Sequence, residues 1–192
     1  MDSIITVVSG LPRSGTTMMM RMLEAGGMEV IVDNIRKGDE DNPNGYYEFE
    51  KAKQIKEDTS WLESTKGKVF KMVSMLLYNL PADLNYKVVF MKRNMKEILA
   101  SQKKMLKRKG KDNGEVRDEE MGVLFNKHLS DIEKWLEEQT NIDVLYVNYN
   151  DVIENPAESV QTVNSFFDNR LDTGRMINVV DKALYRNKAD KL

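Results

Sequence analysis

A loop near the start of the chain combines the residue types that bind an oxyanion. A β-branched apolar run leads into Gly10, Arg13 and Gly15, which are followed by Thr16 and Thr17. We expect a strand, a glycine-flanked loop and then the first turn of a helix. Such a loop turns backbone N–H groups and the positive end of the helix toward a phosphate or a similar group. The segment therefore predicts an anion site with a guanidinium inside the loop.

The details of this loop argue against a nucleotide kinase. Gly10 and Gly15 are spaced as in a Walker A loop, but Thr16 occupies the position of the lysine of that motif. The basic residue is Arg13, inside the loop. This displacement favours a loop that binds something other than a metal-bound triphosphate.

A second arginine follows another predicted strand. The apolar run 87–91 precedes Arg93, and Ser101 comes eight residues after this arginine. Between them, Asn94 and Glu97 have the spacing of the N-cap and N3 residues of a helix. The planar fork of an arginine can donate two parallel hydrogen bonds to one phosphate. Taken alone, an arginine in a surface ion pair is the more common explanation.

Three segments of the chain, in the same order, resemble motifs of the sulfotransferases that use 3′-phosphoadenosine 5′-phosphosulfate (PAPS). Leu11–Thr17 resembles the loop that binds the 5′-phosphosulfate in that family. Tyr86–Gln102 resembles the motif for the 3′-phosphate, and Val144–Pro156 resembles a late strand followed by a tyrosine that touches the adenine side. The resemblance spans most of the chain, so the phosphate explanation of both arginines becomes the stronger one.

The resemblance implies a function and a set of donor-binding residues. The function is transfer of a sulfuryl group from PAPS to an acceptor hydroxyl or amine, without an obligatory metal ion. Arg186 is assigned from a Leu-Tyr-Arg-Asn run that resembles a family ending, although a surface arginine explains it equally well. The residues assigned to the donor are Arg13, Ser14, Gly15, Thr16, Thr17, Arg93, Ser101, Tyr149 and Arg186.

In-line transfer of this kind depends on positioning and on electrostatic stabilisation of the leaving oxygen. We assign the stabilisation to Arg13 and to Lys71, which matches the lysine of the Lys-x-His of cytosolic members. Val73 stands where that motif has histidine, so the usual base is missing.

A glutamate is the substitute that we predict for the missing base. Glu48 and Glu50 lie in a run that resembles Asn-Pro-x-Gly-Tyr-x-Glu of short bacterial sulfotransferases. We favour Glu48, with a pKa raised by desolvation beside Tyr46 and Tyr47. A solvated glutamate at a helix start is an equally good explanation. The single histidine, His128, falls on or beside a helical apolar stripe and is predicted to be a packed, hydrogen-bonded histidine.

Two other classes of function stay open at this point. A P-loop nucleotide kinase explains the first loop but not Thr16 in the lysine position. A non-catalytic nucleotide-binding domain explains the same loops and needs no base. Turnover distinguishes the second class from an enzyme.

Composition sets broad limits on partners and location. The 192 residues include 29 basic and 31 acidic side chains and no cysteine. The near balance of charge argues against nucleic acid or an acidic membrane as a partner. Without a leader pattern or an apolar span of about 20 residues, we expect a cytoplasmic protein. We expect one domain over residues 1–192, and a homo-oligomer is one way to complete a short acceptor site.

The elements that must position these residues alternate between strands and helices. We predict strands over 4–9, 29–32, 69–73, 87–91 and 143–147. We predict helices over about 16–26, 47–62, from 94 to about 107, over 118–139 and after Pro156, with a mobile loop over 107–120. This order indicates a three-layer α/β/α fold around a parallel sheet, of the P-loop-like sulfotransferase kind. In such sheets ligands bind at the carboxyl ends of the strands, where the strand order reverses.

Overall fold

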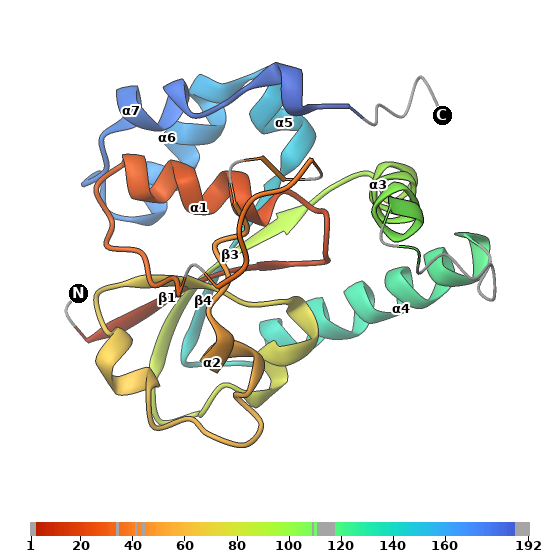
Figure 1. Ribbon diagram of the computed structural model, residues 1–192. Helices are drawn as coiled ribbons and strands as arrows, with labels where there is room; N and C mark the ends of the chain where they lie inside the picture. Colours follow the sequence, from red (N-terminus) through yellow and green to blue (C-terminus); the bar gives the residue numbers. More distant parts are fainter. Residues whose placement is uncertain are drawn as a thin grey trace.

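Four parallel strands form the centre of the molecule (Figure 1). The computed structural model describes residues 3–33, 35–40, 42–43, 45–108, 110 and 118–186. The strand order is β2-β1-β3-β4, and each neighbouring pair is parallel. The strands are β1 (Ile4–Gly10), β2 (Val69–Lys71), β3 (Asn85–Lys92) and β4 (Ile142–Asn148).

The strands are apolar on both faces because both faces are covered. Along β1, Ile5 and Val7 point into one core and Val8 points into the other. Neighbouring β3 repeats this alternation, with Val88 in the first core and Val89 in the second. This is the pattern of a sheet between two helical layers.

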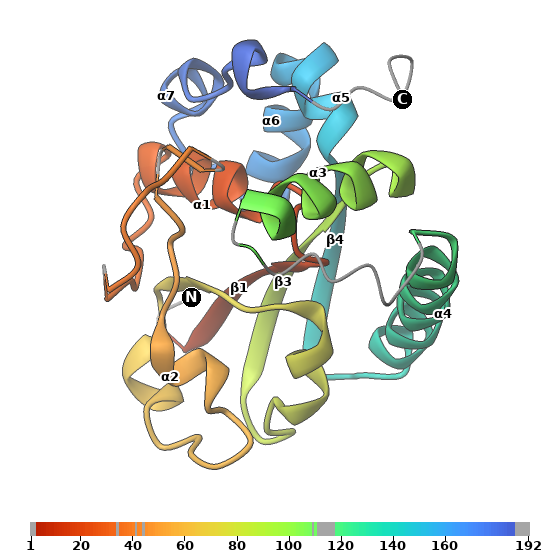
Figure 2. The same ribbon diagram turned by 45° about the vertical axis from the view of Figure 1, so that its right-hand side comes forward.

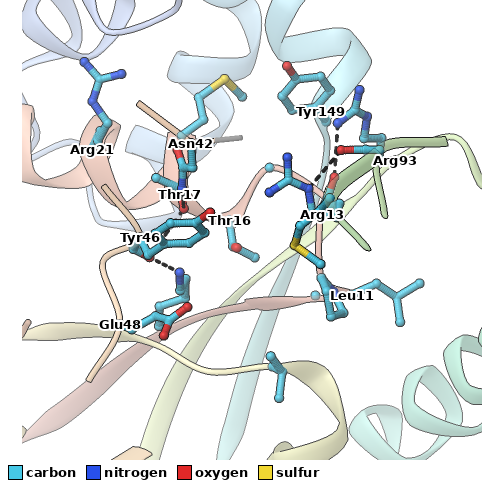
Figure 3. Close-up of a pocket in the computed structure, with 18 of the residues that line it drawn as sticks. Leu11, Arg13, Thr16, Thr17, Arg21, Asn42, Tyr46, Glu48, Arg93 and Tyr149 are labelled. Atoms are coloured by element: carbon cyan, nitrogen blue, oxygen red, sulfur yellow. Dashed lines mark hydrogen bonds between the residues drawn. The ribbon is translucent and has the colours of Figure 1, made fainter. Parts of the chain in front are cut away.

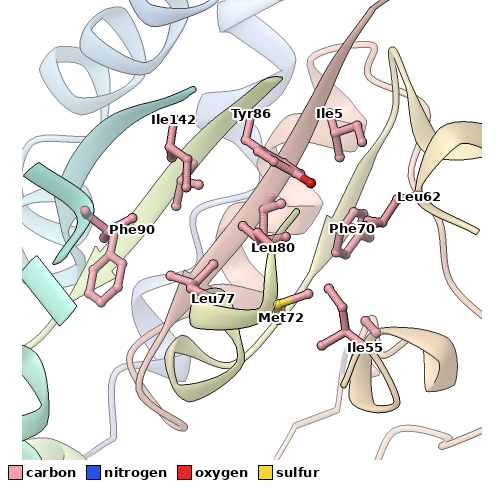
Figure 4. Packing of buried hydrophobic residues seen from close by; sticks show 14 of the residues in the cluster. Ile5, Ile55, Leu62, Phe70, Met72, Leu77, Leu80, Tyr86, Phe90 and Ile142 are labelled. Atoms are coloured by element: carbon pink, nitrogen blue, oxygen red, sulfur yellow. The ribbon is translucent and has the colours of Figure 1, made fainter. Parts of the chain in front are cut away.

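Helices form the two outer layers (Figures 1 and 2). Against one face pack α1 (Thr16–Ala25), α5 (Tyr149–Glu154), α6 (Pro156–Phe166) and α7 (Thr173–Asn178). Against the other face pack α2 (Glu50–Lys53), the 3₁₀ turns η1 (Leu62–Thr65) and η2 (Ser74–Asn79), and α4 (Asp118–Glu137). Beside α4 lies α3 (Met95–Arg108), and η3 (Lys182–Leu184) is a last 3₁₀ turn. Figure 4 shows the core between the sheet and the α2–α4 layer, with Leu77 and Leu80 between Phe90 on one side and Phe70 on the other.

The strand order reverses next to β1. From β1 the chain goes to β2 on one side, and it then returns to β3 on the other side before reaching β4. The carboxyl ends of β1 and β3 therefore flank the point where an open parallel sheet binds its ligand. The glycine loop follows β1 and Arg93 follows β3. The fold class expected from the sequence is confirmed.

Two predicted elements are wrong. The helix expected over 47–62 is reduced to the four-residue α2. Asp58 provides the reason: its carboxylate accepts from the Ser60 N–H at 2.8 Å and its carbonyl accepts from the Trp61 indole at 2.9 Å, bonds that compete with a helix. The strand expected over 29–32 is a single bridge between Val30 and Val69.

The remaining bounds differ by a few residues. The strand predicted over 69–73 ends at Lys71, and the helix predicted to reach 139 ends at Glu137. Of the loop predicted over 107–120, residues 109 and 111–117 lie outside the described residues, and α4 already begins at Asp118. In the described part of the chain, no helix has both the length and the apolar character needed to cross a bilayer.

Candidate active site

The loop after β1 has a backbone that only particular residues adopt. Gly10 and Gly15 have φ of 145° and 101°, and Arg13 has φ of 74°. A Cβ at Gly15 would lie 2.4 Å from the Tyr149 ring, and one at Gly10 would lie 2.6 Å from the Met91 carbonyl oxygen. The two glycines are therefore required both for their dihedral angles and for the close approach of β3 and α5.

Three of the residues predicted to bind the donor are linked by hydrogen bonds at this loop, and Figure 3 shows two of them, Arg13 and Arg93. The Arg13 Nε donates to Ser101 Oγ at 2.9 Å. The Arg93 Nη1 donates to the Arg13 carbonyl oxygen at 3.1 Å. Residues 80 and 88 positions apart are thus brought to one place at the carboxyl edge of the sheet.

A buried carboxylate holds Arg93, and sequence reasoning missed it. Glu97 is 0% exposed and accepts from Arg93 Nε at 2.9 Å. It also accepts from the Asn150 amide at 3.1 Å and from the Tyr185 hydroxyl at 2.5 Å. Burial raises the pKa of Glu97, but the bonds from Tyr185 and Arg93 outweigh it, so its pKa lies below the usual value.

The helix start that Asn94 and Glu97 indicate is found in the structure. The α3 helix begins at Met95, and the Asn94 side-chain oxygen accepts from the Lys96 N–H at 3.0 Å. Glu97 occupies the N3 position, and its carboxylate accepts from Arg93, Asn150 and Tyr185. The i, i+4 spacing of Arg93 and Glu97 was the signal that could have revealed the ion pair.

Two tyrosines complete the surroundings of Arg93. Its guanidinium lies 4.3 Å from the centroid of the Tyr149 ring and 5.7 Å from that of Tyr185. Arg186 comes directly after Tyr185 in the chain and lines the same pocket as Arg93. Its Nη1 donates to the Glu40 carbonyl oxygen at 2.7 Å.

The hydroxyls of the loop are not equivalent. Thr16 and Thr17 line the pocket, and Thr17 Oγ1 accepts from the Asn42 amide at 3.1 Å. Ser14 differs, because its side chain is buried against Gly10 and its N–H donates to the Leu11 carbonyl oxygen at 3.1 Å. The structure does not bring the Ser14 hydroxyl into the pocket.

A second charged cluster lies across the pocket from Arg93 (Figure 3). Glu48 is paired with Arg36 Nη1 and with Lys53 Nζ, each at 2.8 Å. Lys71 Nζ donates to the Tyr46 carbonyl oxygen. Burial lowers the pKa of Lys71 to about 8, against the opposing effect of Glu48.

The raised pKa expected for Glu48 is not found. Burial raises it, but the hydrogen bond from Lys53 and the charges of Lys53, Lys71 and Arg36 outweigh this effect and lower it. Only one of the two neighbouring tyrosines lines the pocket, because Tyr47, at φ 51°, donates its hydroxyl to Glu24 of α1.

His128 is hydrogen-bonded, as expected from its spacing, but it is half-buried and not part of the core that was expected to hold it. Its Nε2 lies 2.8 Å from the buried Ser74 Oγ, and its ring meets Tyr78 edge to face. Burial lowers its pKa. His128 lies outside the set of pocket-lining residues.

One pocket of about 440 Å³ joins both clusters. Its acidic lining residues are Glu48 and Asp181. Its basic lining residues are Arg13, Arg21, Arg36, Lys53, Lys71, Arg93, Lys104, Arg108 and Arg186. The excess of positive charge suits a ligand with several negative charges.

Comparison with known proteins places the chain in a transferase family. The chain matches the family model of the sulfotransferase domain over residues 4–191, and it belongs to this family. No curated protein matches the chain in sequence.

Three solved structures share the fold at low sequence identity. Retinol dehydratase, solved with androsterone and the inactive cofactor PAP, aligns with 96% of this chain at 14% identity and a TM-score of 0.51. Sulfotransferase STF9 from Mycobacterium avium aligns with 91% at 13% identity and 0.56. The sulfotransferase domain from the curacin biosynthetic pathway aligns with 94% at 14% identity and 0.51. The chain spans 64%, 67% and 88% of these chains, respectively.

Proposed function

We propose that the protein is a sulfotransferase that moves a sulfuryl group from PAPS to an acceptor hydroxyl or amine. The observation that carries the proposal is the meeting of Arg13, Arg93 and Ser101 around the glycine loop. Family membership supports it, and so does the structure of retinol dehydratase, which holds PAP. Neither finding favours a P-loop kinase.

The donor would lie along the carboxyl edge of the sheet. Arg13 and the loop around Gly15, with Thr16 and Thr17, would hold the 5′-phosphosulfate, because N–H groups and a helix start suit an anion. The Arg93 guanidinium, Ser101 and Arg186 would bind the 3′-phosphate, and Tyr149 the adenine side. Ser14 would shape the loop rather than touch the ligand, since its N–H is bonded to Leu11.

Lys71 and Arg13 would assist the chemical step. As the acceptor oxygen or nitrogen forms its bond to sulfur and gives its proton to a base or to water, the bond between sulfur and the bridging oxygen breaks, and the electron pair leaves with adenosine 3′,5′-bisphosphate. Positive charge beside that oxygen stabilises the departing group. Glu48 would hold Arg36 and Lys53 in place. A role for Glu48 as general base stays a prediction, because its ion pairs make it a weaker proton acceptor.

The proposal extends to location and assembly. We place the activity in the cytoplasm, where PAPS is made. The single-domain organisation of residues 1–192, the possible homo-oligomer and the absence of a nucleic-acid partner stay predictions.

Calorimetric binding tests the donor site. We expect adenosine 3′,5′-bisphosphate to bind more tightly than ADP or ATP, with or without magnesium. Arg93→Ala should remove this preference, because the arginine recognises the 3′-phosphate. Preference for ATP with magnesium, unchanged in Arg93→Ala, would contradict the proposal. Binding of the bisphosphate without turnover of PAPS on any acceptor would leave a non-catalytic nucleotide-binding domain.

Two further variants make the result interpretable. Arg93→Ala leaves Glu97 buried without this cation, so Ser101→Ala provides a milder test of the same subsite. Arg175→Ala is the matched control, since Arg175 lies on α7 outside the pocket lining and pairs with Asp172 at 3.2 Å. It should bind the bisphosphate like the wild type.

A further inference from the structure

The two acidic side chains that line the pocket differ in how far their oxygens are occupied. In Glu48, Oε1 accepts from Arg36 and Oε2 accepts from Lys53. In Asp181, Oδ1 accepts from the Ala183 N–H at 2.8 Å. Within the part of the chain that the structure describes, Oδ2 of Asp181 has no hydrogen-bond or ion-pair partner. Asp181 can therefore accept a hydrogen bond from a ligand in the pocket.

Asp181 lies on the Tyr149 side of the pocket. After α7 the chain runs back toward α5 (Figures 1 and 2), and the 3₁₀ turn η3 follows directly on Asp181. Tyr185, the next residue after η3, meets the Tyr149 ring edge to face, with 5.8 Å between the ring centroids. Burial raises the pKa of Tyr149, and the negative charge of Asp181 acts in the same direction. The carboxylate is thus close to the tyrosine that we assign to the adenine side.

The surroundings of Asp181 suit a flat, uncharged ring. Met18 of α1 and Val179, which follows α7, line the pocket and pack against the same core as Tyr149. Leu184 of η3 lines the pocket as well. Covering apolar side chains with an aromatic base is favourable. This part of the pocket therefore offers apolar surface together with one acceptor oxygen.

The charge of Asp181 determines which part of the donor can lie beside it. The negative charges of PAPS are on its 5′-phosphosulfate and 3′-phosphate, which we assign to Arg13 and Arg93, and a carboxylate repels both groups. Adenine is uncharged, and its exocyclic amine donates hydrogen bonds. The ribose 2′-hydroxyl also donates, but its carbon is next to the one that carries the 3′-phosphate. The amine is thus the donor group that matches Asp181.

We infer that Asp181 is a specificity-determining residue whose carboxylate accepts a hydrogen bond from the exocyclic amine of the donor's adenine. The inference rests on the proposed function and names a further residue of the same site. A hydrogen bond to a charged acceptor changes affinity by about tenfold or more. The protein therefore selects nucleotides with an amine at position 6 of the purine.

Two bisphosphates that differ only in the amine provide the first test. Calorimetry compares adenosine 3′,5′-bisphosphate with purine riboside 3′,5′-bisphosphate, which has hydrogen in place of the amine. We expect the wild type to bind the adenosine compound about tenfold more tightly, and Asp181→Ala to bind both compounds equally. Equal binding by the wild type, or a preference that persists in Asp181→Ala, overturns the inference. If the wild type binds neither compound, the proposed function fails instead.

A matched control separates the ligand contact from the cap of η3, which Asp181→Ala also removes. Asp172 caps α7 in the same way, because its Oδ1 accepts from the Arg175 N–H at 3.0 Å, and it lies outside the pocket lining. Asp172→Ala should keep the wild-type preference for the amine. Loss of the preference in Asp172→Ala as well would show that capping accounts for the effect, and the inference would be wrong.

Replacing the acceptor by a donor should reverse the preference. In Asp181→Asn the amide oxygen keeps the cap, since Asn and Asp cap helices equally well, and the amide N–H groups then face the base. Such a donor opposes the amine of adenine and matches the 6-carbonyl of hypoxanthine. We expect Asp181→Asn to bind inosine 3′,5′-bisphosphate more tightly than adenosine 3′,5′-bisphosphate, in contrast to the wild type. The wild-type order of affinities in this variant would contradict the inference.

The 2′-deoxy compound tests the ribose as the alternative donor group. Asp181 does not contact the 2′-hydroxyl in our assignment, so its removal should change the affinity of the wild type and of Asp181→Ala by the same factor. A loss of affinity for 2′-deoxyadenosine 3′,5′-bisphosphate that occurs in the wild type alone would assign Asp181 to the ribose and overturn its role in selecting adenine.

Discussion

At the scale of single residues, the ion pair of Arg93 and Glu97 decides how the proposed 3′-phosphate site is built. A buried pair adds little net stability compared with an apolar pair, but removing one partner leaves a charge in the interior. Glu97 fixes the Nε side of the guanidinium and links it to Tyr185. The pair therefore positions Arg93 before any ligand is bound.

Replacing Glu97 by an uncharged residue should reveal the free-energy cost of removing one partner of this buried ion pair. We expect Glu97→Gln to lower the free energy of unfolding at pH 7 by about 3 kcal/mol, as for a broken buried pair. The folded pKa of Glu97 lies below its unfolded value, so its stabilisation is present above the unfolded pKa and is lost as pH falls through the folded pKa. The difference between wild type and variant in urea unfolding should shrink at acidic pH. A difference that is constant with pH would show that Glu97 acts without its charge, and Glu63→Gln, at an exposed pair, is the control.

Lys71 should make donor binding sensitive to mildly alkaline pH. Its pKa is lowered to about 8, mainly by burial, so the ammonium loses its charge as pH rises through that value. We expect the affinity for adenosine 3′,5′-bisphosphate to fall between about pH 7 and 9 in the wild type. Lys71→Arg should bind without this fall because a guanidinium stays charged. A wild-type affinity that is level over this range would contradict the assignment of Lys71 to the donor.

Glu48→Gln separates the two roles open to this carboxylate. A positioning role predicts a loss in kcat of less than about tenfold, whereas removal of a general base costs about 10²–10⁴-fold. We expect the smaller loss, because the single side-chain oxygen of Gln can still accept from one of the two cations, Arg36 or Lys53. The pH profile of kcat should keep its shape. Glu50→Gln is the matched control, since Glu50 pairs with Lys53 but does not line the pocket.

Sequence predicted which residue types meet at the site but not how they pair. Arg13, Arg93 and Ser101 were predictable because each follows a recognisable strand end or lies at a fixed helical distance from one. The partners of Glu48 were not, because Arg36 lies in an irregular segment with no periodic pattern. Asn150 and Tyr185, which hold Glu97, come from α5 and from the segment after η3.

At the scale of elements, the four strands of the sheet were predictable because a strand covered on both faces is a continuous apolar run. The prediction of a helix over 47–62 was wrong because the buried apolar residues of this segment do not lie on one continuous helix. Phe49, Ile55 and Trp61 are in the core, but the chain reaches it through turns fixed by Asp58. Apolar content alone does not distinguish these arrangements.

The glycine loop allows a test in which backbone strain and contact are separated. Gly15 and Gly27 have nearly the same φ, 101° and 102°, but a Cβ meets the Tyr149 ring only at Gly15 and has open space at Gly27. We expect Gly15→Ala to weaken bisphosphate binding by about tenfold or more, because the loop must move away from α5. Gly27→Ala should introduce the same backbone strain, which lowers the stability measured by urea unfolding. It should leave the affinity for the bisphosphate unchanged. Equal affinities in both variants would show that the loop does not hold the donor.

At the scale of the whole molecule, positive charge is concentrated in the pocket although the chain as a whole is nearly neutral. The formal net charge of the chain is −2, but the pocket lining is strongly basic. A cleft of one sign of charge attracts ligands of the opposite sign even when the protein as a whole is nearly neutral.

Salt should therefore weaken donor binding. Raising ionic strength from about 0.05 M to 0.5 M shortens the screening length from more than about 10 Å to less than about 8 Å, so bisphosphate affinity should fall several-fold. Calorimetry in sodium chloride measures this affinity and keeps the ion type constant. An affinity that stays level over this range would mean that the bisphosphate is bound without the charge of the basic pocket lining, and the assignment of that lining to the donor would be wrong.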